Sequence, residues 1–439
     1  MLSYSKPKQP FAISTINPRP QFLPLEAPPI TDVYPSLPGP PRSPVFMPTH
    51  TLSTHIIPAA FPQCPSTPGQ IEMPATFSTK EERAVWIKKT SVEMVHEKLD
   101  LIAGKDVGQV TSSALLWSCI NRIARNSPPE AGKTGITLVV TNPLGFHKEI
   151  WEESLKHMIK LTEEPTSSIR IDEIWAIEAV CHGDSALING ANIPRIIDRA
   201  DYGRDVANMC IHYLPTRNYS GNPLSLHLPR LDTKVSSDRI KNGYKDRKLV
   251  ALGHSLGGDA IALLAIYHPM LLSACILLET TIFPHDPNIN IRGYKIVSMT
   301  LNRKSSWKSR EEARESFLKS PVFKAFDPAV LDAYVNYGLH EDPKTGLVHL
   351  KCKPTWEAAD FMESRVNSEV YELLPTVDEC LELRWIMGGT DDASSLVGGR
   401  EVTQNVVWRR EKNTSNVMIP DANHLVAQEK PYELGKFSN

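Results

Sequence analysis

The sequence predicts an α/β protein with a mostly parallel central sheet and helices on both of its faces. Short apolar runs rich in β-branched residues alternate with segments of helical spacing along most of the chain. One such run, residues 249–252, leads into a glycine-rich turn and then into residues 259–267, which are rich in alanine and leucine. This order of strand, turn and helix is typical of parallel sheets, which bind their ligands at the carboxyl ends of the strands.

The expected elements follow one another in this alternating order. Helices are expected at residues 80–107, 149–162, 202–213 and 259–267. Strands are expected at residues 55–61, 113–123, 135–141, 168–180, 247–252, 272–279 and 380–387, with a last short strand formed by residues 405–408 and 417–419. Residues 216–247 are polar and irregular and predict a surface insertion.

The domain organisation is predicted from composition and from the points where the alternation is interrupted. Residues 1–50 are rich in proline and lack apolar periodicity, so we expect a disordered tail. Residues 286–375 separate two strands and contain stretches of helical character, so we expect a helical cap over the site. Residues 51–285 and 376–439 then form the two parts of the core.

Composition and charge disfavour several classes of protein. The 439 residues carry a formal net charge of -2 with scattered lysines and arginines, so no nucleic-acid partner is expected. The seven cysteines contain no C-x-x-C pair, which predicts a reduced protein without structural zinc. No run approaches the roughly 20 apolar residues that span a membrane. A cytoplasmic location is expected, because the first residues lack a signal-peptide core and the last three differ from the S-K-L peroxisomal signal. A peroxisomal location is the alternative, and it rests on the family resemblance described below.

The glycine-rich turn contains the candidate nucleophile. Residues Gly253–Gly258, G-H-S-L-G-G, match the G-x-S-x-G nucleophile elbow, in which Ser255 occupies a sharp turn between a strand and a helix. Side chains larger than glycine beside this serine would clash with the crossing backbone. Leu256 begins the following helix, and its N–H is a candidate oxyanion donor. A glycine-rich connection of another α/β protein is the alternative, but the strand before the turn and the helix after it favour the elbow.

A serine nucleophile needs a base to take its proton and an acid to orient that base. In hydrolases with this elbow, the acid and then the histidine follow the serine in the sequence. His424 is the candidate base, because it lies far downstream in a loop after the last expected strand. His254 is a poor candidate, because neighbouring residues in a tight turn point apart. The acid stays open between Glu279, which ends the strand after the elbow helix, and Asp391 or Asp392, which follow the next strand.

The second oxyanion donor should come from the loop after an early strand. Residues 135–141 form that expected strand, and the loop after it contains Gly145 and Phe146. The N–H of Phe146 is therefore the candidate donor, and a plain turn at Gly145 is the alternative.

Several segments also resemble a known family. They are Leu144–Glu149, similar to N-G-F-x-K-E; Ile174–Trp175 with His182–Ala186, similar to I-W-I-A-D followed by Q-G-x-S; Asp201–Asp205, similar to D-H-x-R-D; and Gly253–Gly258, similar to G-H-S-x-G-G. Together they resemble a fungal group of α/β-hydrolases. This group includes a peroxisomal lipase-like protein, toxin-biosynthesis hydrolases and the acyl-CoA hydrolase of mycophenolic acid biosynthesis. The resemblance runs from about residue 54 to the end and leaves out residues 80–107 and 216–247.

The resemblance implies an α/β-hydrolase fold with a helical cap inserted after the strand that follows the elbow. In that group the acid ends this strand, so the resemblance favours Glu279 and keeps Asp391 as the alternative acid. This sequence departs from the pattern of that group at two places. Residues Thr141–Leu144 replace the group's histidine-containing approach to the oxyanion loop, and the peroxisomal carboxyl-terminal tripeptide is not present in this sequence.

These features predict a serine hydrolase of the esterase, lipase or thioesterase type, which cleaves a small-molecule acyl ester or thioester through an acyl-enzyme. The cap suggests a hydrophobic acyl or polyketide-like substrate. No metal or cofactor is implied, and the oligomeric state is not predicted. The alternatives are a non-catalytic protein of this fold that binds a small molecule or a partner, and acyl transfer to an alcohol other than water.

Overall fold

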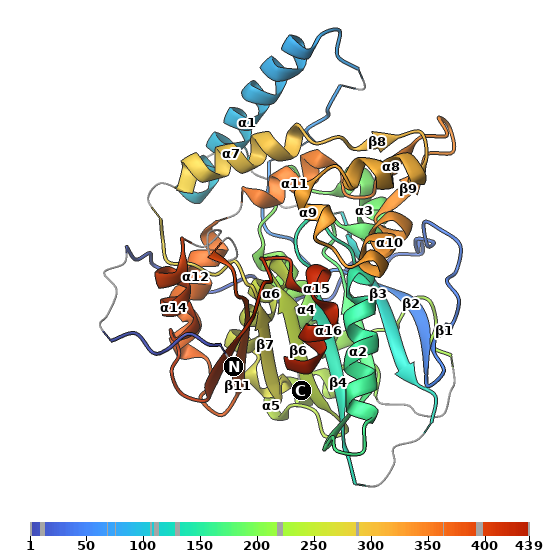
Figure 1. Cartoon of the computed structure of the whole chain (residues 1–439), viewed down its shortest axis with the longest axis vertical. Helices are drawn as coiled ribbons and strands as arrows, with labels where there is room; N and C mark the ends of the chain where they lie inside the picture. The colour runs from blue at the N-terminus through green and yellow to red at the C-terminus, as the bar shows by residue number, and fades with distance from the viewer. Residues whose placement is uncertain are drawn as a thin grey trace.

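The computed structural model describes residues 2–8, 14–67, 69–74, 76–105, 108, 114–127, 132–216, 223–286, 289–362, 364–391 and 398–437. A nine-stranded sheet of order β1-β2-β3-β5-β4-β6-β7-β11-β12 lies at its centre (Figure 1). The strands are β1 (Val45–Met47), β2 (His50–Pro58), β3 (Trp117–Arg125), β4 (Thr134–Thr141), β5 (Ile169–Ile177), β6 (Lys248–His254), β7 (Ala274–Leu278), β11 (Glu382–Gly388) and β12 (Thr414–Ile419). Strands β5, β4, β6, β7, β11 and β12 run parallel, while β1, β2 and β3 pair antiparallel.

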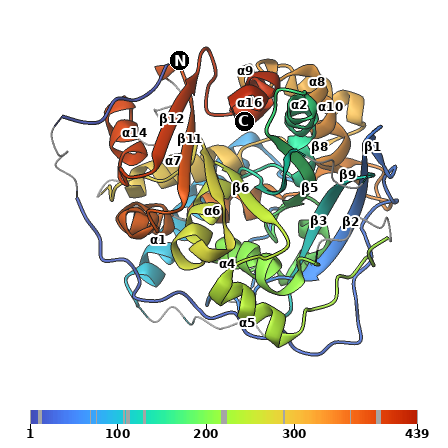
Figure 2. The same ribbon diagram turned by 90° about the horizontal axis from the view of Figure 1, so that it is seen from below.

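Helices cover both faces of the sheet, because side chains of the central strands alternate between two apolar layers. In β6, Leu249 and Ala251 face the layer that holds α4 (Ala200–Asn208), α6 (Leu256–Tyr267) and α12 (Arg365–Leu373). Leu252 faces the other layer, which holds α2 (Glu152–Glu163) and α16 (Pro431–Phe437) (Figure 2). The predicted fold class, a mostly parallel sheet with helices on both faces, is confirmed.

The register of the parallel strands brings the expected site segments to one edge of the sheet. His254 at the end of β6 pairs with Leu278 at the end of β7. On the other side of β6, Thr141 at the end of β4 pairs with Gly253. The chain therefore leaves β4, β6 and β7 at the same level, and the residues that follow them are neighbours in space.

A second unit covers this edge (Figure 1). It contains α7 (Ile289–Leu301), α8 (Arg310–Phe317), α9 (Pro321–Lys324), α10 (Pro328–Tyr337) and α11 (Pro354–Phe361). It also contains a small antiparallel sheet of β8 (Ser306–Trp307), β10 (Val348–Leu350) and β9 (Leu339–Glu341), which the sequence did not predict. The insertion follows β7, as the resemblance implied, while its predicted boundaries at residues 286–375 stay a prediction.

The long helix α1 (Lys80–Ile102) lies beside α7 and extends the cover of the site (Figure 1). It begins at Thr79, whose side chain accepts a hydrogen bond from the Glu82 N–H. Glu81 and Glu82 lie in its first turn, where negative charge is favourable. A segment outside the family resemblance therefore contributes to the architecture of the site.

Some expected elements differ from the observed ones. Of residues 405–408, predicted as part of a strand, residues 405–407 lie in helix α14 (Arg400–Val407) and Trp408 follows its last residue. Val402, Val406 and Val407 pack on the core at helical spacing. Residues 216–247, predicted as irregular, contain helix α5 (Thr233–Asn242), which begins at the capping residue Asp232. The described residues also form helices α3 (Gly183–Asn189) and α15 (Val426–Glu429).

The proline-rich segment makes defined contacts in its described part. Tyr4 is buried, and the Met418 N–H donates to the carbonyl of Leu2. The Arg19 guanidinium forms ion pairs with Asp198 and with Glu369 of α12. These contacts connect the segment to both the core and the cover of the site.

We expect deletion of residues 1–50 to lower the melting temperature by about 3–5 °C, because it exposes the surface under Tyr4 and leaves Glu369 without the Arg19 partner. Differential scanning calorimetry of the full chain and the truncated chain measures this shift. An unchanged melting temperature would instead support the disordered tail that the sequence predicts.

Candidate active site

Ser255 lies in a strained turn between β6 and α6. Its backbone has a φ of 54°, a value that non-glycine residues rarely adopt. The Ser255 N–H donates to the Leu278 carbonyl at 3.0 Å, which fixes the turn against β7. A Cβ on Gly253 would lie 2.3 Å from the Gly257 carbonyl oxygen, and one on Gly257 would lie 2.6 Å from the Thr141 carbonyl oxygen. The glycines of the motif are therefore required by the close approach of the backbone.

The structure brings Ser255, His424 and Glu279 together. The Nε2 atom of His424 lies 3.0 Å from Ser255 Oγ, and its Nδ1 atom lies 3.1 Å from Glu279 Oε2. A carboxylate only accepts hydrogen bonds, so Nδ1–H donates to Glu279 and leaves Nε2 to accept the Ser255 hydroxyl proton. This geometry is that of a nucleophile, a base and an orienting acid.

Glu279 is held at the end of β7 by its own set of partners. It has a φ of 42° and is buried, and its N–H donates to the Ile386 carbonyl of β11. Burial raises the pKa of the Glu279 carboxyl, while the hydrogen bonds and charge of His424 and the Gly388 N–H oppose that rise. The carboxylate is thus fixed between the imidazole and the backbone of β11.

The alternative acid lies in a different environment. The Asp391 side chain is 88% exposed and forms an ion pair with Arg400. Asp392 lies outside the described residues. Among the candidates that the structure describes, Glu279 is the one in contact with His424.

His254 holds the loop that carries His424, a role that the sequence did not suggest. A carbonyl oxygen only accepts, so His254 donates its Nε2–H to the His424 carbonyl at 2.8 Å. Burial lowers the pKa of His254 to about 3, so the ring stays neutral and keeps this tautomer. His254, next to the candidate nucleophile, therefore helps to position the candidate base.

The candidate oxyanion donors lie on two segments. Leu256 is the first residue of α6, where an N–H has no partner within the helix. The Phe146 N–H, predicted as the second donor, donates to the Pro143 carbonyl at 3.2 Å and closes a turn. On the same loop, the Leu144 N–H has no acceptor within the part of the chain that the structure describes. Leu144 is therefore a donor candidate that the sequence analysis missed, since the turn depends on the folded loop.

A cavity of about 810 Å³ opens onto Ser255 and His424. Aliphatic and aromatic side chains form much of its wall, and they come from α1, α7, α9 and α11 with the residue after it: Val95, Leu99, Ile102, Ile296, Met299, Val322, Phe323, Phe361 and Met362. A cavity of this size accommodates a large ligand. Helix α1 thus contributes directly to the wall of the cavity.

The cationic side chains along this cavity have partners within the protein. Arg303 forms an ion pair with Glu357, and Arg199 Nε donates to Asp360 Oδ1 at 2.9 Å. Lys98 Nζ donates to the Ile197 carbonyl at 3.2 Å. The cavity is therefore suited to an uncharged, apolar group.

Comparisons with known proteins show what the chain resembles. No protein-family model matches the chain. The abhydrolase domain-containing protein AFT2-1 of Alternaria alternata is 26% identical over 214 residues, which cover 42% of this chain and 79% of that protein. The type I acyl-CoA thioesterase mpaH of Penicillium brevicompactum is 24% identical over 210 residues, which cover 47% of this chain and 41% of that protein. The alignment with mpaH therefore spans less than half of that relative.

A solved structure extends the likeness over most of the fold. The peroxisomal alpha-beta-hydrolase Lpx1 of Saccharomyces cerevisiae superposes with a TM-score of 0.60 and 16% identity, covering 89% of this chain and 87% of that chain. The chain therefore has the α/β-hydrolase fold. More particularly, its resemblance to the fungal α/β-hydrolases is confirmed. No helix within the described ranges is both long and apolar enough to cross a membrane.

We expect Glu279→Gln to lower kcat by about 10³–10⁴, because an amide in place of the carboxylate no longer holds the imidazole in the tautomer that accepts the serine proton. Steady-state kinetics with a chromogenic ester measures the loss. Asp391→Asn is the matched control, since that carboxylate is exposed and paired with Arg400, and it should leave kcat unchanged. The opposite pattern would assign the acid to Asp391.

Proposed function

We propose that this protein is a serine hydrolase that cleaves a carboxylic ester or thioester of a hydrophobic acyl group. The observation that carries the proposal is the hydrogen-bonded arrangement of Ser255, His424 and Glu279 at a large apolar cavity. The resemblance to fungal α/β-hydrolases supports a hydrolase, and the one named a type I acyl-CoA thioesterase supports a thioester as one candidate substrate bond.

The proposed reaction begins with the Ser255 hydroxyl. Its Oγ attacks the substrate carbonyl carbon while His424 Nε2 takes the hydroxyl proton, and Glu279 stabilises the imidazolium that forms. The negative charge on the carbonyl oxygen is stabilised by the Leu256 N–H and by an N–H of the loop that contains Leu144 and Phe146.

Collapse of this intermediate breaks the bond to the leaving group. The alkoxide or thiolate departs with the proton from His424 and leaves the acyl group bonded to Ser255 Oγ. Water then attacks the acyl-enzyme carbonyl and gives a proton to His424. The second intermediate collapses to the free acid as the bond to Ser255 Oγ breaks, and His424 returns the proton to Ser255 Oγ. The transfers of the acyl group and of the protons in this scheme involve only the substrate, water and these residues.

The cavity supports the choice of a hydrophobic acyl group. Its cationic wall residues are engaged by Glu357, Asp360 and a backbone carbonyl, so an anionic group that bound them would compete with an existing partner. Burial of an unpaired charge is typically unfavourable by about 3–5 kcal/mol. An apolar chain meets no such penalty.

A fluorophosphonate probe tests the nucleophile directly. The probe should label the wild-type chain on the peptide that contains Ser255, because only an activated serine reacts with it. Peptide mapping by mass spectrometry locates the label, and Ser255→Ala should abolish it. An unlabelled but folded wild-type chain would favour the non-catalytic binding protein instead.

The chain length of the acyl group is tested at helix α1. Leu99→Trp should lower kcat/KM for a p-nitrophenyl decanoate at least about 10-fold relative to the acetate, since the larger side chain fills the cavity. Val85→Trp is the matched control on the same helix, because Val85 is exposed and does not line the cavity. Equal effects of Leu99→Trp on both esters would place the acyl group elsewhere.

A further inference from the structure

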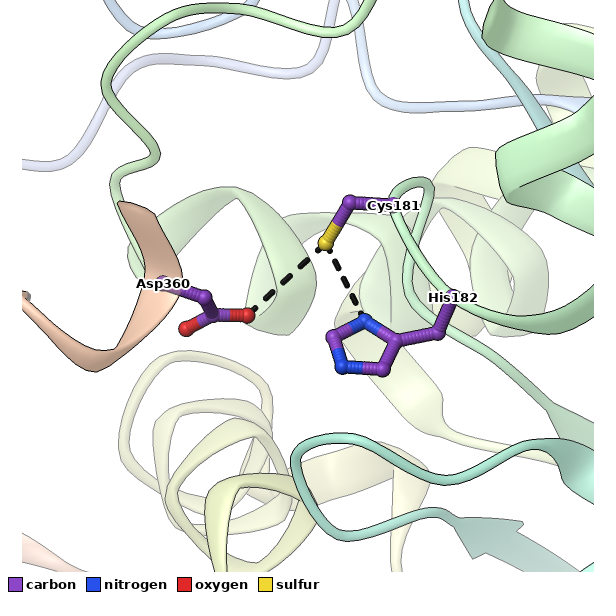
Figure 3. A group of neighbouring side chains, drawn as sticks. All are labelled: Cys181, His182 and Asp360. Atoms are coloured by element: carbon purple, nitrogen blue, oxygen red, sulfur yellow. Dashed lines mark hydrogen bonds between the residues drawn. The ribbon is translucent and has the colours of Figure 1, made fainter. Parts of the chain in front are cut away.

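A buried group of three side chains lies beside the loop that carries the candidate oxyanion donors. Cys181 and His182 come from the turn between β5 and α3, and Asp360 comes from α11 above the sheet. Figure 3 shows Cys181 between the other two, with its Sγ 3.1 Å from His182 Nδ1 and 3.8 Å from Asp360 Oδ2. Each of the three is buried and each could ligate a metal ion.

The hydrogen bonds of His182 argue against a metal site. The Gly145 N–H donates to His182 Nε2 at 2.8 Å, so this nitrogen is an acceptor. Burial lowers the pKa of His182 to about 4, so the ring is neutral and carries its single proton on Nδ1. A protonated Nδ1 has no lone pair for a metal ion and instead donates to the Cys181 sulfur. Burial also raises the pKa of Cys181, which keeps it a thiol that donates to Asp360.

The three side chains are therefore part of a directed chain of hydrogen bonds. It begins at the Gly145 N–H and passes through His182 and Cys181 to Asp360. Gly145 has a φ of 81°, and a Cβ at this position would lie 2.8 Å from Glu357 Oε1 of α11. The loop is thus enclosed between the His182 ring and α11.

The series of hydrogen bonds continues from Asp360 to the elbow helix α6. Arg199 Nε donates to Asp360 Oδ1 at 2.9 Å, and Arg199 NH1 donates to Asn367 Oδ1 at 3.0 Å. Asn367 Nδ2 then donates to Asp259 Oδ2 at 2.7 Å. Asp259 lies in the first turn of α6, whose first residue is Leu256. One buried network therefore connects the two segments that carry the candidate oxyanion donors.

We propose that His182 is a positioning residue of the oxyanion hole, which fixes the Leu144–Phe146 loop by accepting the Gly145 N–H. The inference rests on the proposed hydrolase function. Oxyanion donors act because they are already in place when charge develops on the substrate oxygen. A shift of the loop by about 1 Å would lower the rate on the order of 10²-fold. His182 stabilises the loop through its hydrogen bond with the Gly145 N–H and does not touch the reacting atoms.

Two variants separate the hydrogen bond from the space that the ring fills. His182→Leu removes the acceptor and should lower kcat about 10- to 100-fold for p-nitrophenyl butyrate, with KM and the melting temperature nearly unchanged. His182→Gln retains an acceptor at the side-chain end and should return kcat to within about 3-fold of wild type. Equal losses in both variants, or no loss in His182→Leu, would overturn the proposal.

An inhibitor adds a measurement that a purely structural role would not change. A trifluoromethyl ketone with an alkyl chain adds to Ser255 as a tetrahedral oxyanion, so it requires the oxyanion hole. In His182→Leu its inhibition constant should rise by the same factor by which kcat/KM falls. A methyl ether of the same chain length, which cannot form the oxyanion, should bind wild type and variant alike. A matching rise for both compounds would contradict the proposal.

Further measurements separate this inference from the proposed function. Hydrogen–deuterium exchange of the peptide containing Gly145 should be faster in His182→Leu than in wild type or His182→Gln, whatever the activity. Failure of the fluorophosphonate to label Ser255 would overturn the proposed function, whereas unchanged exchange would overturn the role of His182. Stoichiometric zinc in the wild-type chain that is lost in His182→Leu would also overturn it and assign a metal site.

Discussion

The strained turn at Ser255 is the constraint on which the rest of the site depends. A non-glycine residue at a φ of 54° is disfavoured by about 1–3 kcal/mol and persists only where its surroundings hold it. The Ser255 N–H is bonded to Leu278, and Gly253 and Gly257 allow α6 to lie against the strand ends. The packing of the buried parallel strands offsets this strain. Its consequence is a serine whose hydroxyl faces His424 and whose neighbour Leu256 begins the helix.

The turn that contains the candidate nucleophile could be predicted from sequence because its geometry is local. Residues Gly253–Gly258 specify the turn, and the apolar strand and helix around them confirm it. The acid could not be chosen from spacing, since Glu279 and Asp391 both follow strands that end at the same edge of the sheet. Their environments differ only in the folded chain, where one carboxylate is buried beside His424 and the other is exposed beside Arg400.

The features that sequence reasoning missed depend on contacts between distant segments. The hydrogen bond from His254 to the His424 carbonyl joins residues 170 positions apart. The turn in which Phe146 donates to Pro143, and so leaves Leu144 as the available donor, is a property of the folded loop. Helix α1 was predicted from its periodicity, but its place along the cavity could not be, because no local pattern encodes which surface a helix covers.

The polar network beneath the cavity connects the inserted segment to the core by buried hydrogen bonds. Asp259 belongs to the core, whereas its partner Asn367 and the carboxylate of Asp360 belong to the inserted segment. Arg199, the residue before helix α4 of the core, donates hydrogen bonds to both Asp360 and Asn367. Loss of one member of a buried ion pair typically destabilises a protein by about 3–5 kcal/mol, because the remaining charge is left uncompensated. The inserted segment therefore contacts the first turn of the elbow helix through the hydrogen bond from Asn367 to Asp259, in addition to forming part of the cavity wall.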